Sequence, residues 1–232
     1  MNVSMIMLVT IFFPIFLGAA ILFAPEFRSR NRLLAVEGAG LVITAALAGC
    51  ALGSGQTKLF LFRLGDKLDI CFHLDNLGRL FVVIVTIVWV FTGFYSFEYM
   101  KHEREEKRYF GFYLMAFGVL LALSFAGNIV TYYLFYELMT LISVPLVLHS
   151  RTKEAIMGGL KYLFYSLCGA YMVLFGIYFL NKYADTLNFT AGGALNRELA
   201  AGNEKLLLVV AFFMILRSEE RRVGKEGRAR WS

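Results

Sequence analysis

Long uncharged stretches recur along this chain, and they constrain its fold more than any other feature. Runs of about 17 to 25 apolar residues are long enough to cross roughly 30 Å of hydrocarbon as helices, whereas a buried helix of a water-soluble protein usually ends sooner. The 232 residues are 59% hydrophobic and 17% charged, which leaves too much apolar surface for a water-soluble domain. The sequence therefore predicts an all-α integral membrane protein.

The apolar runs predict a polytopic helical bundle with about six full transmembrane helices and an incomplete seventh. We expect the six helices at residues 4–23, 33–52, 77–97, 109–125, 128–149 and 155–180. The seventh run, residues 206–216, holds eleven apolar residues, too few to span a bilayer. Glu37 lies near the start of the second helix, and we expect its side chain to snorkel to the membrane surface.

A short hairpin is expected between the second and third helices. Within residues 53–75, the segment LFLFRLGDKLDICFHLD alternates apolar and polar residues around Gly65 and Asp66, as a hairpin on the membrane surface would. Asp75 and Arg79 follow, one helical turn apart. We expect them to cap the third helix and to form an i,i+4 charge pair.

The last sixteen residues, RSEERRVGKEGRARWS, differ abruptly in composition from the apolar run before them, with six basic residues and three glutamates. Their sequence resembles translated vector or adapter sequence. We therefore expect residues 1–216 to be the N-terminal part of a transmembrane domain and residues 217–232 to be a non-native tail, with the native chain continuing past Leu216. The alternative is an ordinary charged cytoplasmic tail.

Basic residues are distributed unequally between alternate loops, and short cytoplasmic loops carry the excess of Lys and Arg. Nine lie in the three short loops after the first, third and fifth helices: Arg28, Arg30, Arg32, Lys101, Arg104, Lys107, Arg108, Arg151 and Lys153. Seven lie in two longer segments on the other side: Lys58, Arg63, Lys67, Arg79, Lys182, Arg197 and Lys205. We expect the amino terminus outside. The net charge of +6 thus follows from topology and the tail, and we expect no nucleic-acid partner.

The residues that usually hold metals or perform catalysis do not form a motif. Cys50, Cys71 and Cys168 lack CxxC spacing and do not cluster with histidines, so we expect no metal, and we interpret the cysteines as packing residues. No Ser/His/Asp set, HExxH motif or carboxylate pair converges within the helices. A membrane enzyme with its own catalytic centre is therefore poorly supported.

Glu137 is the residue that points most directly to a function. It lies about nine residues into the fifth helix, close to the bilayer midplane. A carboxylate at that depth costs about 2.5 to 3.5 kcal/mol on insertion scales, so it must face protein or water and is usually functional. The alternative is a structural carboxylate that bridges helices through Tyr133 and Thr140, which lie on the same helix face.

Lys161, about 10 Å into the sixth helix, is the second candidate. Its stem can snorkel to water, but Gly158, Gly159, Ser166 and Gly169 indicate close helix packing around it. Together Glu137 and Lys161 suggest a proton relay that is bridged by water or by side chains along a proton path. The path residues are Tyr133, Thr140, Tyr165 and His149, and for His149 a solvated loop position is the favoured alternative.

The sequence resembles the antiporter-like membrane subunits shared by complex I, Mrp-type cation/proton antiporters and membrane-bound hydrogenases. The resemblance covers residues 1–216 and is most specific in two runs, YYLFYELMTLISVPLVLH and GGLKYLFYSLCGA. FHLDNLGRLF and YSFEYM, near the two ends of the third helix, also contribute to it. It implies a fourteen-helix protein with two inverted five-helix repeats, each containing a broken helix. It also implies that Glu137 faces a lysine on helix seven, and this chain lacks that lysine.

The resemblance further implies that the chain carries no flavin, quinone headgroup or iron–sulfur cofactor, because redox chemistry belongs to partner subunits. The function that it implies is proton or cation/proton translocation by a subunit of an NADH:quinone oxidoreductase-like or Mrp-type complex. The expected partners are other membrane subunits, the lipid bilayer, and protons or Na⁺, and the expected location is the bacterial plasma membrane. The rival hypothesis is a passive membrane scaffold or assembly subunit whose buried charges only hold helices together.

Overall fold

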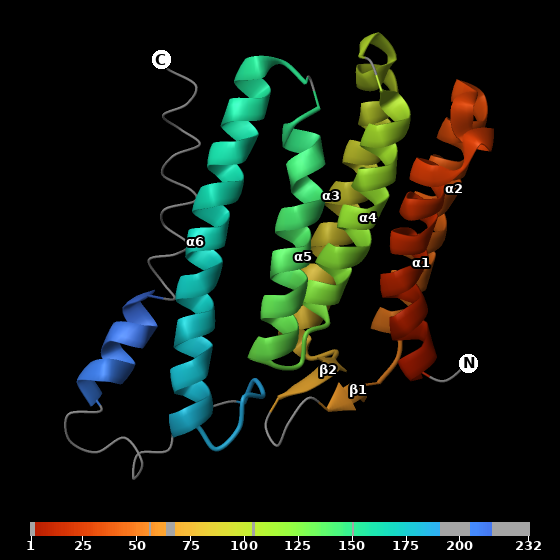
Figure 1. Cartoon of the computed structure of the whole chain (residues 1–232). Helices are drawn as coiled ribbons and strands as arrows, with labels where there is room; N and C mark the ends of the chain where they lie inside the picture. The colour runs from red at the N-terminus through yellow and green to blue at the C-terminus, as the bar shows by residue number, and fades with distance from the viewer. Residues whose placement is uncertain are drawn as a thin grey trace.

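The computed structural model describes residues 3–55, 57–63, 68–103, 105–149, 151–190 and 205–214, and for Arg28 it describes the backbone alone. They form a bundle of long helices that lie side by side, with a two-stranded hairpin across one end (Figure 1). The helices are α1 (Val3–Phe23), α2 (Arg30–Leu52), α3 (Asn76–Tyr99), α4 (Glu106–Ser124), α5 (Ile129–Val147) and α6 (Lys153–Tyr183). Short 3₁₀ turns, η1 (Pro25–Arg28) and η2 (Met100–His102), follow α1 and α3.

The lengths of these helices match membrane spans. Within the described residues, α1, α2, α3, α5 and α6 are long and apolar enough to cross a bilayer. The sixth long helix, α4, has 19 residues and begins with the charged Glu106, Lys107 and Arg108, which lower its mean hydropathy. A shorter apolar helix, Lys205–Met214, corresponds to the expected incomplete seventh. Residues 217–232, interpreted above as foreign, lie outside the described residues.

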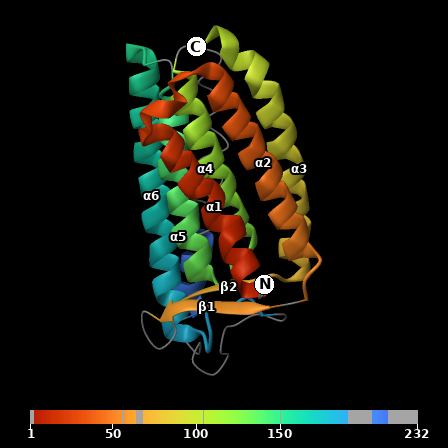
Figure 2. The same ribbon diagram turned by 90° about the vertical axis from the view of Figure 1, so that its right-hand side faces the viewer.

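Helix α4 forms the centre of the bundle and contacts α1, α2, α3 and α5 (Figure 2). It packs most closely on α1, because glycines let the two backbones approach. A Cβ atom built on Gly118 would lie 2.6 Å from the Ile11 carbonyl oxygen, and one on Gly111 would lie 3.0 Å from the Gly18 carbonyl oxygen. Small residues at such crossings are typical of membrane helices, which associate through packing rather than through the hydrophobic effect.

The predicted hairpin is present. Strands β1 (Lys58–Arg63) and β2 (Asp69–His73) pair antiparallel, with an irregularity between Phe60 and Phe62. The expected turn at Gly65 and Asp66 lies outside the described residues. Strand β2 also bonds to the turn between α4 and α5, because the His73 amide donates to the Phe125 carbonyl at 2.7 Å and the Gly127 amide donates to the Cys71 carbonyl at 3.0 Å. The hairpin therefore fixes the α4–α5 turn.

Side-chain caps begin three of the helices. Asp75 Oδ1 accepts a hydrogen bond from the Gly78 amide at 2.6 Å, Asn128 Oδ1 accepts from the Thr131 amide and Thr152 Oγ1 accepts from the Ala155 amide. The predicted cap by Asp75 is therefore confirmed. The predicted pairing of Asp75 with Arg79 is wrong, because Arg79 Nη2 instead donates to the Ser54 carbonyl at 2.7 Å.

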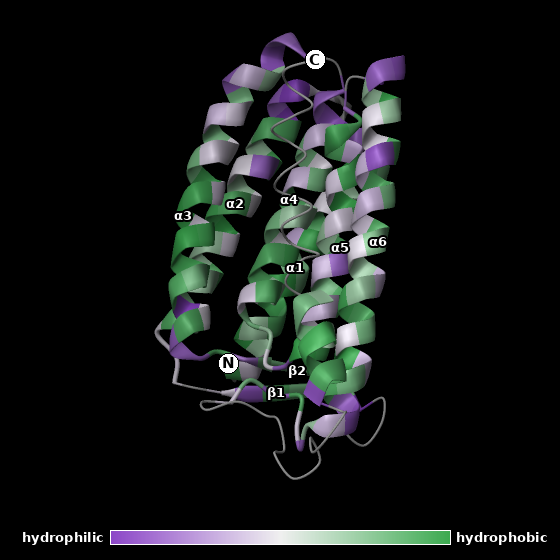
Figure 3. Ribbon diagram, turned by 90° about the vertical axis from the view of Figure 1, so that its left-hand side faces the viewer, coloured by the Kyte–Doolittle hydropathy of each residue, from purple (hydrophilic) through white to green (hydrophobic). Residues whose placement is uncertain are grey.

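Hydrophilic residues gather at the two ends of the bundle, and hydrophobic residues fill its middle (Figure 3). The end opposite the hairpin carries three ion pairs, Arg30–Glu106 at 3.0 Å, Lys101–Glu98 at 3.3 Å and Arg151–Glu105 at 3.5 Å. We call this the charged end, and the other the hairpin end. The charged end holds the three short basic loops that the sequence assigns to the cytoplasm.

Candidate functional site in helices α5 and α6

Glu137 lies near the middle of α5, as the sequence predicts. It lies eight positions after Ile129, the first residue of the helix, which corresponds to a depth of about 12 Å. Its side chain is half-buried within the chain. A carboxylate so far from either end of an apolar helix cannot be explained by surface solvation.

The face of α5 that carries Glu137 packs against α6 through polar side chains, which we call the α5–α6 seam. Three contacts cross the seam: Tyr133 Oη donates to the Ala170 carbonyl at 3.4 Å, Ser166 Oγ donates to Thr140 Oγ1 at 3.4 Å, and Ser143 Oγ lies 3.1 Å from Tyr162 Oη. Glu137 is one turn from both Tyr133 and Thr140, so it shares their face. The structure thus brings three of the predicted site residues together.

Lys161 lies on a different face of α6, where it is exposed on this chain. Glycines were expected to enclose it, and that expectation is wrong. Gly158 has no neighbour within 4 Å, and Gly159 lies on the buried face against Leu148. Two residues correspond to about 200° around a helix, so Lys161 and Gly159 point in nearly opposite directions.

Lys161 and Glu137 also differ in depth. The seam contacts of Thr140 and Tyr133 place Glu137 level with residues 166–170 of α6. Lys161 is therefore roughly 10 Å nearer the charged end. Tyr165 is likewise exposed, at 41% of its surface. Lys161 therefore lies outside the seam.

His149 lies at the charged end, just beyond α5. Its ring packs edge-on against Tyr109 of α4, with centroids 5.9 Å apart. Both ring nitrogens are buried and have no hydrogen-bond partner among the described residues. The favoured interpretation of His149 as a solvated loop residue is therefore wrong, because Tyr109, in the first turn of α4, covers the imidazole.

Arg108 holds the end of α5 that carries His149. Its Nη2 donates to the carbonyls of Pro145 at 3.4 Å, Leu148 at 3.1 Å and His149 at 3.1 Å. Such bonds satisfy carbonyls that a helix end leaves without partners, and the cation also stabilises the negative end of the helix dipole.

We expect Arg108→Gln to lower the free energy of unfolding by about 1 to 3 kcal/mol, because three carbonyls would lose a charged donor. Thermal unfolding in detergent measures the effect. Lys101→Gln is the matched control, since Lys101 is exposed and pairs with the exposed Glu98. Equal stability of the two variants would contradict this role for Arg108.

Glu37 is a further ionisable residue whose position sequence reasoning got wrong. The expected snorkelling does not occur, because the side chain is 0% exposed. Glu37 belongs to the stripe of α2 that faces the bundle, together with Leu33, Leu41, Thr44 and Ala48. The spacing of these residues by three or four was a signal that could have placed Glu37 inside.

The cysteines occupy two kinds of position. Cys71 is buried in strand β2 of the hairpin, where burial and the nearby Asp69 raise the pKa of its thiol, as expected for a packing residue. Cys50 and Cys168 are exposed on the helix surface, so they do not pack within this chain. Within the described ranges, no three His, Cys, Asp or Glu side chains converge as metal ligands.

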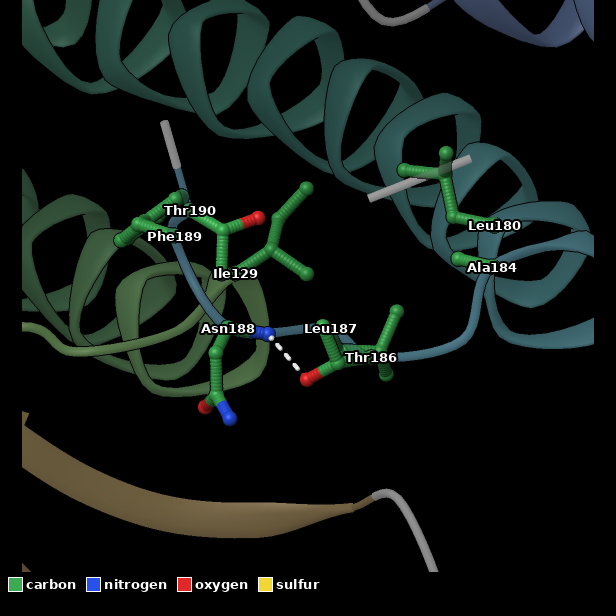
Figure 4. Close-up of a pocket in the computed structure, with 8 residues that line it drawn as sticks. All are labelled: Ile129, Leu180, Ala184, Thr186, Leu187, Asn188, Phe189 and Thr190. Carbon is green, nitrogen blue, oxygen red and sulfur yellow. Dashed lines mark hydrogen bonds between the residues drawn. The ribbon is translucent and has the colours of Figure 1, made fainter. Parts of the chain in front are cut away.

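A cavity of about 170 Å³ lies at the hairpin end, between α6, the start of α5 and the segment that follows α6 (Figure 4). The lining residues are Ile129, Leu180, Ala184, Thr186, Leu187, Asn188, Phe189 and Thr190. None of these side chains is ionisable. The cavity is also remote from the midspan position of Glu137, so the seam remains the candidate site.

Two family descriptions match consecutive parts of the chain. Residues 62–110 match the N-terminus of chain 5 of NADH-ubiquinone oxidoreductase (complex I), and residues 126–218 match the transmembrane region of the NADH:quinone oxidoreductase/Mrp antiporter family. Glu137 and Lys161 fall within the second region, whereas Glu37 falls outside both.

Curated relatives include subunits of bacterial Na⁺/H⁺ antiporters. The Bacillus subtilis protein is 25% identical over 82% of this chain and 39% of its own length, and the Alkalihalophilus pseudofirmus protein is 22% identical over 90% and 43%. The chain thus spans about two fifths of the length of these relatives.

In solved structures, a chain of respiratory complex I from Thermus thermophilus shares the fold, with a TM-score of 0.67 at 18% identity over 90% of this chain and 43% of that one. Two consecutive family matches, relatives that align along most of the chain and a shared fold lead to one conclusion: the chain belongs to the family of antiporter-like membrane subunits found in complex I and Mrp antiporters.

Proposed function

We propose that the chain is part of a membrane subunit that translocates protons, or exchanges cations for protons, within a respiratory or antiporter complex. The observation that carries the proposal is Glu137, a carboxyl group at midspan on a seam of hydroxyl side chains. A carboxyl group there can alternate between charged and neutral forms, and hydroxyl groups can relay its proton through water. The family of the chain supports the same function.

In this proposal, Tyr133 and Thr140 lie along the proton path beside Glu137, and His149 lies at its charged end. Lys161 acts from a distance, through its charge or through water. The exposed position of Lys161 also supports the presence of partner subunits, because a lysine inside a membrane span is stable only when it snorkels or when other protein covers it. We propose that further membrane helices pack on this face of α6.

The test is transport by the protein expressed from its native gene, together with the subunits that purify with it. The complex is sealed into vesicles, and internal pH is followed after an electron donor or a Na⁺ gradient is supplied. We expect a pH change that disappears when the subunit is omitted. An undiminished change without the subunit would favour the passive scaffold.

We also propose that the charged end faces the cytoplasm of a bacterial cell and that the amino terminus is outside. The nine basic residues in short loops support this orientation. A cysteine that replaces exposed Lys101 should react with a membrane-impermeant maleimide only in inverted vesicles. Labelling of this cysteine in intact cells would reverse the orientation.

A further inference from the structure

Glu37 is an acidic side chain that the seam does not use, and it lies inside the other half of the bundle. Helix α2 packs against α1, α3 and α4. Glu37 itself has no exposed surface. One turn away, Leu41 and Tyr113 both crowd against Gly93, and a Cβ atom on Gly93 would lie 3.2 Å from the Tyr113 ring. The carboxyl group is therefore in a closely packed environment.

No cation in the described residues neutralises this group. Both carboxyl oxygens of Glu37 are buried without a hydrogen-bond partner among the described residues. Helix α1 has no charged side chain at all. Arg30, two turns away on the same helix, already binds Glu106 and the Phe97 carbonyl.

The other packed elements offer no compensating charge either. In α3, Glu98 is exposed at the charged end and Arg79 binds the Ser54 carbonyl at the hairpin end. The charged residues of α4 lie in its first turn. Tyr113 of α4 lies within electrostatic range of Glu37. An unpaired carboxylate in such a site costs several kcal/mol, whereas the neutral acid costs far less.

A line of aromatic side chains in ring contact leads from this site to the charged end. The starts of α2 and α4 are joined by the Arg30–Glu106 ion pair, and Glu37 and Tyr113 each lie seven residues further, about 10 Å deeper. Tyr113 stacks on Tyr109 with centroids 5.7 Å apart. Tyr109 in turn contacts His149.

The hydroxyl groups along this line are available to relay a proton. Tyr113 Oη donates to the Trp89 carbonyl at 2.6 Å and also hydrogen-bonds with the Thr92 side chain. Tyr109 Oη lies 3.1 Å from Ser96 Oγ, and either group can be the donor.

We propose that Glu37 is a second protonation site of this subunit, held as a neutral acid and exchanging its proton with the charged end through the Tyr113, Tyr109 and His149 side chains. The proposal deepens the proposed translocation function by adding a site in α1–α4 to the one in α5. It stands on burial and packing, so its test does not require transport.

Infrared difference spectroscopy of the purified complex in lipid tests the protonation state. The spectrum of wild type minus Glu37→Gln should contain the C=O band of a carboxylic acid at neutral pH. The same difference for Glu98→Gln, an exposed control on α3, should contain carboxylate bands. Carboxylate bands for Glu37 would overturn the proposal. Glutamine is a neutral isostere, so we expect Glu37→Gln to fold. If it does not, Glu37→Met supplies the same subtraction.

Hydrogen–deuterium exchange of the same band tests the route. We expect Tyr109→Phe and His149→Phe to slow the shift of the Glu37 band in D₂O at least about fivefold, because each removes a relay group. Tyr99→Phe is the matched control, since Tyr99 is 61% exposed at the same end of the bundle. Unchanged exchange in both variants would refute the route. Glu137→Gln should leave the Glu37 band in place. The protonation of Glu37 can therefore be tested even if Glu137 proves to have no role in transport.

Discussion

Replacing Glu137 by glutamine is expected to reduce coupled ion transport at least about tenfold while the complex still assembles. Glutamine has nearly the same size and keeps hydrogen-bonding capacity on the α5–α6 seam. It cannot ionise, so no rotamer restores a step in which the group alternates between charged and neutral. A purely structural carboxyl group would instead be replaced at little cost, and stability could rise because a buried charge is removed.

The measurement is the proton gradient formed per turnover by purified complex in sealed vesicles, with assembly checked on native gels. Glu154→Gln is the matched control, because Glu154 is exposed in the first turn of α6. Lys161→Met is measured in parallel, and we expect a smaller loss because Lys161 lies outside the seam. Normal transport by well-assembled Glu137→Gln complex would leave Glu137 a structural residue.

Gly118→Ala is expected to destabilise the bundle by about 1 to 3 kcal/mol, as overpacked cores generally are. The added methyl group would lie 2.6 Å from both the Ile11 carbonyl oxygen and the Ile15 side chain, and 3.0 Å from Pro14. The carbonyl is backbone and cannot rotate away. Helices α1 and α4 would therefore have to separate, and α4 is the helix on which most others pack.

Gly158→Ala is the control for this prediction, because nothing lies within 4 Å of its added methyl group. Alanine also favours helix over glycine by about 0.5 to 1 kcal/mol, so this variant should be unchanged or more stable. Thermal unfolding in one detergent compares the two variants. A similar change in both would mean that the close approach of α1 and α4 does not limit stability.

The sequence alone determined the elements of this fold, because the bilayer imposes a length on each apolar run. The six long helices, the hairpin and the depth of Glu137 all follow from spacing along the chain. The cap by Asp75 also follows from the sequence, since it involves residues three apart. These features depend on local interactions and on one external dimension, the thickness of the membrane.

The tertiary structure decided which way each helix faces. Lys161, expected among close-packed glycines, is exposed, whereas Glu37, expected at the surface, is fully buried. His149, interpreted as a solvated loop residue, has buried ring nitrogens and packs against Tyr109. Apart from the stripe of α2, these helices are apolar on most sides, so they lack the amphipathic pattern that reveals orientation in water-soluble proteins. Rotation is set instead by backbone approach at glycines such as Gly118, and this depends on two helices that are more than a hundred residues apart in the chain.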